Sequence, residues 1–250
     1  MNFDLSGRVA FVTGATSGLG KHFARVLSQA GAAVAISGRR KDRLLELQKD
    51  IESAGGKCAA VVLDVTDATQ IPRALDEAEK ALGHIGILVN NAGMSVDGPV
   101  AEIAVADFDA VLSTNLRAPF VLAQEIGRRM IARKQGGRII NISSITAFRV
   151  LAGSAPYCIS KAGLSMMTQC LAREWARYDI NVNAICPGFI ETELNEAWFH
   201  TEKGQAYVKS FPRRRLQEAS DLDGTLLLLA SDASKAITGS LFTVDEGQSI

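Results

Sequence analysis

The chain has 250 residues, and its 27 basic and 27 acidic side chains give a formal net charge of zero. Because no overall field attracts a polyanion, we expect no nucleic-acid partner. Hydrophobic residues form 47% of the chain and charged residues 22%, values that argue against a disordered or fibrous protein and indicate a globular one.

The sequence gives no sign of export or of membrane insertion. Residues 1–8 contain an early acid and no apolar run, unlike a signal or transit peptide. The apolar run 226–230 is far shorter than the ~20 residues that a membrane span needs. We therefore predict a cytoplasmic protein with no membrane partner. The four cysteines show no CxxC spacing, so we expect buried thiols rather than a metal site or a redox dithiol.

Short apolar runs alternate with longer amphipathic ones along the chain. The predicted strands are 9–13, 33–37, 59–63, 85–90, 138–142, 181–185 and 241–244, and the predicted helices are 19–30, 41–54, 68–82, 106–134, 155–178 and 218–230. This alternation predicts crossover units and a parallel sheet. The expected fold class is α/β, a doubly wound parallel sheet of about seven strands with helices on both faces. No linker or repeat divides residues 1–250, so we predict a single domain.

A glycine-rich turn, TGATSGLG at residues 13–20, follows the first predicted strand. Glycines at this position would allow a tight turn and close approach to a pyrophosphate, while the following helix would offer its N–H groups. The spacing is GxxxGxG rather than the usual GxGxxG, and glycines that merely cap a helix are the alternative. The candidate cofactor-binding residues of this turn are Gly14, Thr16, Ser17, Gly18, Leu19 and Gly20.

Basic residues follow the second predicted strand. An acidic residue there would accept the ribose hydroxyls of NAD, whereas Gly38 leaves room and Arg39 offers a guanidinium suited to a 2′-phosphate. We therefore expect NADP(H) to be favoured over NAD(H). The alternative is a solvated charge run on a surface helix.

Tyr157 and Lys161 lie four residues apart on a predicted helix that Ser154 would cap, so their side chains share one face. A nearby ammonium favours the phenolate and would lower the tyrosine pKa from ~10 toward the range useful for acid-base catalysis. Any amphipathic helix can place Tyr and Lys in this way, so a purely structural pair is the alternative.

An irregular insertion at residues 189–212 carries several aromatic side chains. A long connection late in an α/β fold is more often a binding loop or lid than idle chain. A pair of helices packed on the surface is the alternative reading.

Taken together, these motifs resemble the short-chain dehydrogenase/reductase family in its compact form, with a single Rossmann-like domain. The resemblance spans almost the whole chain, because the motifs occur in the family's order. They are residues 13–20, Asp64 with Val65, the run Asn90, Asn91, Ala92 and Gly93, then Asn115, Ser144, Tyr157 with Lys161, and Pro187 and Gly188 with Thr192.

The resemblance implies catalytic roles for four residues. Tyr157 would be the acid-base catalyst, and Ser144 would hydrogen-bond the substrate oxygen, with Ser143 as its rival. Lys161 would lower the pKa of Tyr157 and hold the nicotinamide ribose. Asn115 lies on an apolar helix stripe, and Pro119 leaves its carbonyl without a helical donor, so a water there would connect Lys161 to solvent. A plain helix kink is the alternative.

The resemblance also implies where the cofactor lies. Asp64 and Val65 would lie beside the adenine, and Asn90 near the adenine ribose, although Asp64 could simply cap a helix. The remaining candidate cofactor contacts are Asn91, Ala92, Gly93, Tyr157, Lys161, Pro187, Gly188, Ile190 and Thr192.

The implied activity is hydride transfer between a nicotinamide cofactor and a ketone or secondary alcohol. A non-catalytic, dinucleotide-binding regulatory protein is the alternative. Ile145, Phe148, Val150, Leu151 and part of the 189–212 insertion would give an apolar pocket for a small-molecule substrate, with 3-oxoacyl thioesters as one option. Sugars and polyols are the other option, because Glu193, Asn195 or His200 could supply polar groups.

The predicted helices 106–134 and 155–178 carry apolar residues around much of their circumference. Helices of that kind need a second burial partner. In the resembling family these helices pair between subunits, so we expect a symmetric homo-oligomer, a tetramer or a dimer.

Overall fold

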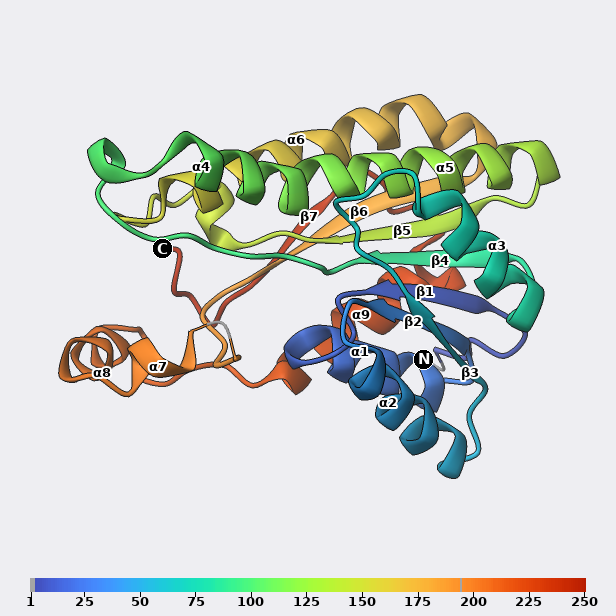
Figure 1. Ribbon diagram of the computed structural model, residues 1–250, viewed down its shortest axis with the longest axis horizontal. Helices are drawn as coiled ribbons and strands as arrows, with labels where there is room; N and C mark the ends of the chain where they lie inside the picture. The colour runs from blue at the N-terminus through green and yellow to red at the C-terminus, as the bar shows by residue number, and fades with distance from the viewer. Residues whose placement is uncertain (1–2, 194) are drawn as a thin grey trace.

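The computed structural model describes residues 3–193 and 195–250, and a parallel β-sheet forms its centre (Figure 1). The strands of the described residues are β1 (Val9–Thr13), β2 (Ala33–Gly38), β3 (Cys58–Val62), β4 (Ile85–Asn90), β5 (Gly137–Ile142), β6 (Ile180–Pro187) and β7 (Leu241–Val244). Their order across the seven-stranded sheet is β3-β2-β1-β4-β5-β6-β7, with every neighbouring pair parallel. This order confirms the predicted doubly wound fold.

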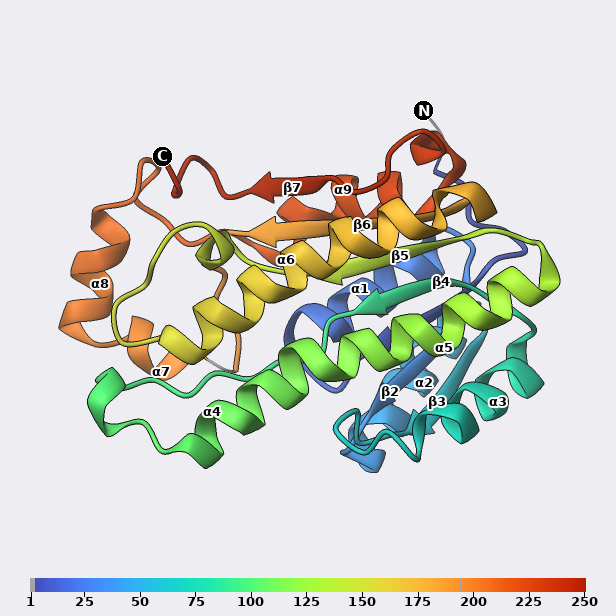
Figure 2. The same ribbon diagram turned by 90° about the horizontal axis from the view of Figure 1, so that it is seen from above.

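Helices cover both faces of the sheet. The α-helices are α1 (Gly18–Gln29), α2 (Lys41–Ser53), α3 (Ile71–Leu82), α4 (Val105–Leu112), α5 (Ala118–Arg133), α6 (Ala155–Trp175), α7 (Glu196–Phe199), α8 (Glu202–Lys209) and α9 (Asp223–Ala230). Single 3₁₀ turns are η1 (Val100–Glu102), η3 (Ile145–Ala147), η4 (Ala176–Tyr178), η5 (Ala219–Leu222) and η6 (Asp232–Ser234). Figures 1 and 2 show α1, α2 and α9 on one face and α3, α5 and α6 on the other. Within the described residues, no helix combines the length and apolar character that a membrane crossing needs.

Alternation along the central strands builds two cores. Ala10 and Val12 of β1 belong to the cluster that packs against α1 and α9, whereas Val9 and Phe11 belong to the cluster under α3, α5 and α6. Successive side chains of a strand point to opposite faces, so a strand buried on both faces is apolar throughout. This burial fixes the sheet and therefore the edge at which the strands end.

The predicted helix 106–134 is not continuous. A π-helical turn, η2 (Ser113–Arg117), separates α4 from α5, and the N–H of Ala118 donates to the Ser113 carbonyl five residues back. A π turn accommodates one extra residue and is frequent at functional sites. The predicted irregularity near Pro119 therefore exists, but as a widened turn that contains Asn115.

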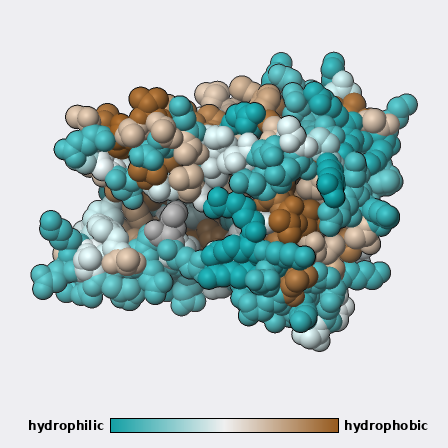
Figure 3. All heavy atoms as spheres, in the orientation of Figure 1, coloured by the Kyte–Doolittle hydropathy of each residue, from teal (hydrophilic) through white to brown (hydrophobic). Residues whose placement is uncertain are grey.

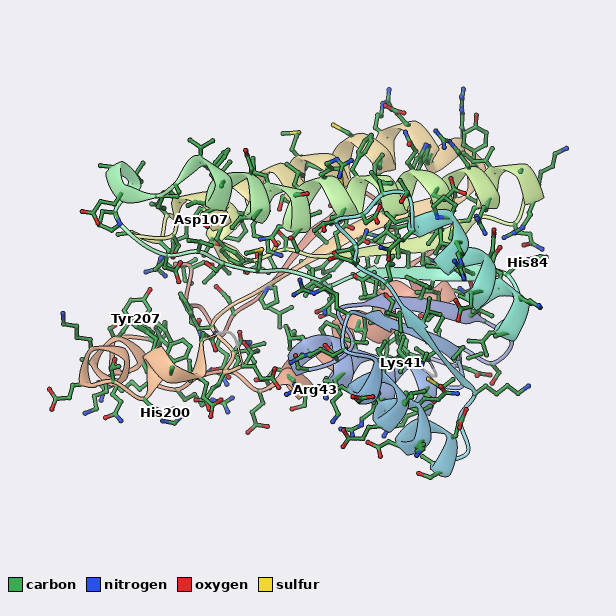
Figure 4. The ribbon with its side chains drawn as sticks, viewed as in Figure 1. Lys41, Arg43, His84, Asp107, His200 and Tyr207 are labelled. Carbon is green, nitrogen blue, oxygen red and sulfur yellow. The ribbon has the colours of Figure 1, made fainter. Side chains whose placement is uncertain are left out.

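The insertion at 189–212 contains the two short helices α7 and α8, so the helix-pair reading describes its structure. Its aromatic side chains pack on one another: the rings of Phe189 and Phe211 stack at 5.4 Å between centroids, and Tyr207 meets both edge-on at 5.4 and 5.0 Å. Figure 4 shows Tyr207 and His200 on this segment, away from the central sheet.

Candidate active site

A cleft with a volume of about 530 Å³ lies where the carboxyl ends of the strands meet. Figure 3 shows that face of the molecule hollowed between the α7–α8 segment and the helices above it. The residues that line the cleft come from the β1–α1 turn, from the ends of β2, β4 and β5, from α6 and from the chain after β6. Open α/β sheets bind their ligands at this edge.

The glycine turn forms one wall of the cleft with backbone atoms. Gly14 has a φ of +66°, and a Cβ there would lie 2.8 Å from the Cα of Ala92. A Cβ on Gly20 would lie 2.3 Å from the Gly14 carbonyl oxygen. The Asn91 amide fixes the turn by donating to the Thr13 carbonyl at 3.0 Å. Only glycine fits these two positions, and the bare cradle that results fits a pyrophosphate at the start of α1.

Two arginines line the cleft at the end of β2. Arg39 is exposed at the predicted place, and a Cβ on Gly38 would lie 2.8 Å from the Thr16 methyl, so any larger residue would crowd the turn. Arg40, which the sequence analysis missed, donates from Nη2 to the hydroxyls of Thr16 and Ser17, both at 2.8 Å. The guanidinium of Arg40 therefore lies directly against the glycine turn.

Glu193 joins the two sides of the cleft. Its carboxylate accepts from Arg40 Nη1 at 3.2 Å and from Arg43 Nη1 at 2.6 Å. These hydrogen bonds hold the pKa of Glu193 below its usual value. Figure 4 shows Arg43 at the start of α2, on the side that faces the α7–α8 segment.

The residues after β3 and β4 divide into two groups. Asp64 and Val65 line the cleft, and Asp64 Oδ1 also accepts from the Thr66 N–H at 3.0 Å and its hydroxyl at 2.7 Å, so it caps a turn as well. Asn91, Ala92 and Gly93 line the cleft too. The placement of Asn90 near the adenine ribose is wrong: it is buried, does not line the cleft and donates to Asn141 Oδ1 at 2.9 Å.

Two neighbouring serines at the end of β5 have different surroundings. Ser143 is buried and donates to the Lys161 carbonyl at 3.1 Å, with the Ser165 hydroxyl 2.9 Å away. Ser144 lines the cleft together with Tyr157 and acts to lower the pKa of its phenol. Because the backbone is extended here, consecutive side chains face opposite ways. The geometry therefore places Ser144, and not Ser143, beside the phenol.

Tyr157 and Lys161 lie together at the start of α6, with the ammonium 5.4 Å from the centre of the phenol ring. Burial raises the pKa of Tyr157 to about 12, and the Ser144 side chain only partly opposes this rise. Burial also lowers the pKa of Lys161 to about 8. Loss of solvent therefore sets the direction of the shift in the tyrosine pKa, and the expected lowering of that pKa by Lys161 stays a prediction.

Lys161 and Asn115 anchor the floor of the cleft. Lys161 is 4% exposed, and its Nζ donates to the Ile142 carbonyl at 2.7 Å. The buried Asn115 amide accepts from the Met94 N–H and donates to the Met94 carbonyl, both at 2.8 Å, and also donates to the Ser160 hydroxyl at 3.0 Å. Asn115 thus ties the chain after β4 to α6. A water relay through it stays a prediction.

The chain after β6 borders the same cleft, where Pro187, Gly188, Ile190 and Thr192 all line it. Two buried glutamines that the sequence analysis missed hold this segment. Gln217 accepts from the Gly188 N–H at 3.1 Å, and Gln248 accepts from the Phe189 N–H at 2.7 Å. Gln217 and Gln248 lie 29 and 59 residues from the backbone groups that they bind, so no local sequence motif marks them.

The expected apolar substrate pocket is wrong in three of its four residues from the 145–151 segment. Ile145 is buried, Phe148 and Val150 are 54% and 88% exposed, and none of the three lines the cleft, whereas Leu151 does. The lining mixes polar and apolar side chains: Ser95, Asp97, Thr146, Ser154 and Asn195 line the cleft, as do Met94, Phe189 and Ile190. Ile145 and Thr146 sit in a 3₁₀ turn whose curvature could not be read from an apolar run.

Outside the cleft, one group of described side chains could hold a metal ion. Glu191, Glu196 and His200 are exposed, with possible ligand atoms within 4.8 Å of one another. Of the three residues expected to supply polar groups to the substrate, Glu193 and Asn195 line the cleft and His200 does not.

Comparison with known proteins gives the family. Residues 8–203 match the family described as short chain dehydrogenase. The chain belongs to the short-chain dehydrogenase family. It is 35% identical to gluconate 5-dehydrogenase of Gluconobacter oxydans (98% of this chain, 96% of the relative) and 36% identical to 3-oxoacyl-[acyl-carrier-protein] reductase of Thermotoga maritima (97% and 98%).

A solved structure agrees over the whole fold. The gluconate 5-dehydrogenase of Burkholderia cenocepacia, crystallised with NADP and tartrate, has a TM-score of 0.94 and 36% identity over 99% of this chain and 97% of that one. This short-chain dehydrogenase is thus an NAD(P)-dependent oxidoreductase that acts on CH–OH groups or their carbonyl counterparts. The alternative of a non-catalytic regulatory protein is wrong.

Proposed function

We propose that this short-chain dehydrogenase uses Tyr157 as general acid-base catalyst for carbonyl reduction and the reverse alcohol oxidation, with NADPH as the favoured cofactor. One observation carries the proposal: the Lys161 ammonium lies 5.4 Å from the centre of the Tyr157 ring, and both residues line the same cleft as Ser144 and the glycine turn. A bound nicotinamide supplies or accepts the hydride.

The protonation state of the site suits reduction. Since burial raises the pKa of Tyr157 to about 12, the phenol keeps its proton at neutral pH and can donate it to the carbonyl oxygen. Ser144 holds that oxygen beside the phenol. In the oxidation direction Tyr157 must accept a proton, so the rate of oxidation should rise with pH.

Lys161 and Asn115 serve this centre from below. The buried ammonium keeps one hydrogen bond, to the Ile142 carbonyl, and has further donors for a ribose hydroxyl. Asn115 fixes Met94 and Ser160 on either side of the cleft floor. In this proposal Asn115 positions the floor of the cleft. The proposed reaction uses no metal ion bound by the protein.

The preference for NADPH rests on Arg39 and Arg40. Both guanidinium groups line the cleft at the end of β2, where the adenosine ribose would lie, and Arg40 is already held by two hydroxyls of the glycine turn. Guanidinium groups suit a phosphate because they donate several hydrogen bonds in one plane.

We also propose a symmetric homo-oligomer. Large apolar side chains are exposed on α4, α5 and α6: Val105 at 75%, Phe120 at 44%, Ile159 at 51% and Met166 at 60%. Exposed apolar residues gathered on one face are typical of subunit contacts. Light scattering at micromolar concentration tests this, and a monomer would overturn it.

The experiment that tests the catalytic role is the Tyr157→Phe substitution, followed by NADPH absorbance with a panel of ketones. Loss of the phenol hydroxyl should lower kcat by about 10²- to 10⁴-fold, the usual contribution of a positioned acid. Tyr178→Phe, which removes a hydroxyl from η4 outside the cleft, is the matched control. Unchanged turnover in Tyr157→Phe would refute the role.

A further inference from the structure

The substrate end of the cleft combines apolar side chains, among them Met94 and Leu151, with several hydroxyls and the Asp97 carboxylate. Asp97 Oδ1 accepts from the Ser154 hydroxyl at 2.6 Å and from the Ser95 hydroxyl at 2.9 Å. Its second oxygen receives no hydrogen bond from any described residue. The exposed Asp97 side chain thus presents a free acceptor to the cleft, on a carboxylate that already binds two hydroxyl donors.

Thr146 adds a second polar group to this wall. The residue is 7% exposed, and its Oγ1 has no hydrogen-bond partner among the described residues. Its backbone N–H donates to the Ser144 hydroxyl at 3.1 Å, which places Thr146 two residues from the proposed oxygen-binding serine. A buried hydroxyl without a partner is costly, so rotation of the Thr146 side chain toward a ligand hydroxyl in the cleft would relieve that cost.

The charges along the cleft are unequal at its two ends. Among the described lining residues the cations are Arg39, Arg40 and Lys161. The two arginines lie at the β2 end, and the lysine ammonium is buried against the Ile142 carbonyl. The substrate end holds the Asp97 carboxylate, whose charge also reaches Tyr157 and disfavours a negative charge there. No described cation remains to pair with a substrate carboxylate.

From this wall we infer that the substrate is a neutral polyhydroxy compound, a polyol or its ketose, and that Asp97 and Thr146 determine this specificity. The inference rests on the proposed function and deepens it. A substrate hydroxyl donates to the free Asp97 oxygen, and another hydroxyl pairs with Thr146. A sugar acid would place its carboxylate near Asp97, and an acyl chain would leave both polar groups without partners.

Sorbitol and gluconate provide a matched pair, because they share the same carbon skeleton and differ in charge at one end. With NADP⁺, kcat/KM for sorbitol should exceed that for gluconate by roughly tenfold or more, because a site built for hydroxyls discriminates strongly. Fructose should be reduced with NADPH. A preference for gluconate, for a 3-oxoacyl thioester or for a cationic amino alcohol would overturn the inference, as would absence of turnover with both sorbitol and fructose.

Variants assign the specificity to the two residues. Asp97→Asn should narrow the ratio between sorbitol and gluconate, whereas Asp107→Asn, an exposed acid of α4 outside the cleft, should leave it unchanged. Thr146→Val should raise KM for sorbitol with little change in NADPH binding, and Thr146→Ser should restore it. A ratio that does not move in Asp97→Asn contradicts the assignment.

The two proposals fail separately. If another carbonyl compound is turned over and Tyr157→Phe abolishes this turnover, the proposed function stands and the polyol inference falls. If sorbitol is preferred but Tyr157→Phe remains active, the specificity stands and the acid-base role falls. Calorimetric titration of sorbitol into the enzyme with NADP⁺ provides a binding readout that is independent of turnover.

Discussion

In the cofactor half of the cleft, the glycine turn forms one wall with backbone atoms, whereas the substrate half is lined by side chains. Gly14 and Gly20 leave no room for a Cβ, so their backbone shapes the surface that faces the pyrophosphate. Asp97 and Thr146 instead present hydroxyl and carboxylate oxygens. A backbone wall tolerates few substitutions, while a side-chain wall can be altered one residue at a time. The first half therefore specifies a class of reaction, and the second specifies a particular substrate.

The largest predicted effect is on folding stability, and it concerns Lys161, which lies where the two halves of the cleft join. A fall in pKa from 10.5 to about 8 means that the buried ammonium costs about 3 kcal/mol of folding stability below pH 8. This cost disappears as the pH rises from 8 toward 10.5, because the unfolded chain then binds the extra proton. We therefore compare the free energy of unfolding of Lys161→Met with that of the wild type. The difference in favour of the variant should be larger at pH 7 than at pH 10 by up to about 3 kcal/mol.

Urea unfolding of both proteins at several pH values measures this difference. Lys80→Met removes a lysine from the exposed surface of α3 and controls for the loss of positive charge. A stability difference for Lys161→Met that stays constant between pH 7 and pH 10 would show that no depressed lysine titrates at this junction.

The backbone wall is tested by Gly20→Ala. The new methyl would lie 2.3 Å from the Gly14 carbonyl oxygen, and an overpacked site of this kind costs about 1–3 kcal/mol. NADPH binding, followed by fluorescence, should weaken by about 10- to 100-fold. Gly224→Ala is the control, because a Cβ there meets no atom within 4 Å. Equal NADPH binding by Gly20→Ala and Gly224→Ala would show that the backbone wall tolerates a side chain at position 20.

The next largest predicted effect is on the preference for NADPH over NADH. Arg39→Asp should weaken NADPH binding by about tenfold and leave NADH binding nearly unchanged, because a charge-assisted hydrogen bond contributes about 1.5–3 kcal/mol and this one is exposed. Arg40→Ala should act in the same direction and should also loosen the glycine turn. Competitive titration with the two cofactors measures both. Equal affinity of the wild type for NADPH and NADH would remove the idea.

The smallest effect concerns Glu193, which competes for Arg40. Glu193→Gln should free the guanidinium and improve NADPH binding two- to fivefold, since exposed ion pairs are worth about 0.2–1 kcal/mol. Glu191→Gln, an exposed acid two residues earlier that does not line the cleft, is the control. Weaker NADPH binding in Glu193→Gln would mean that the ion bridge helps to hold the cofactor instead.

The sequence predicted the cofactor half well because its signal is local. The turn at 13–20 needs glycines at fixed positions beside a strand and a helix, and such a pattern is visible without a structure. Tyr157 and Lys161 share one turn of α6, so their spacing alone brings them together.

The substrate half could not be predicted in this way, because its residues meet only through the fold. Asp97 reaches Ser154 across 57 positions. The apolar run near Ile145 seemed to predict an apolar pocket, yet a 3₁₀ turn buries Ile145 and leaves Phe148 exposed. The rise in the Tyr157 pKa was missed because burial is a property of the folded chain.

The π turn at 113–117 acts as a spacer. A chain shortened by one residue there could run as one uninterrupted α-helix through α4 and α5, with more regular hydrogen bonding. Because the π turn absorbs its extra residue, the same deletion would leave α4 and α5 nearly in phase and would remove only the widened turn that carries Asn115. Asn115 would then leave Met94 and Ser160, and the floor of the cleft would lose its brace. The irregular turn in this helix thus lets one amide side chain hold together two segments that are distant in the sequence.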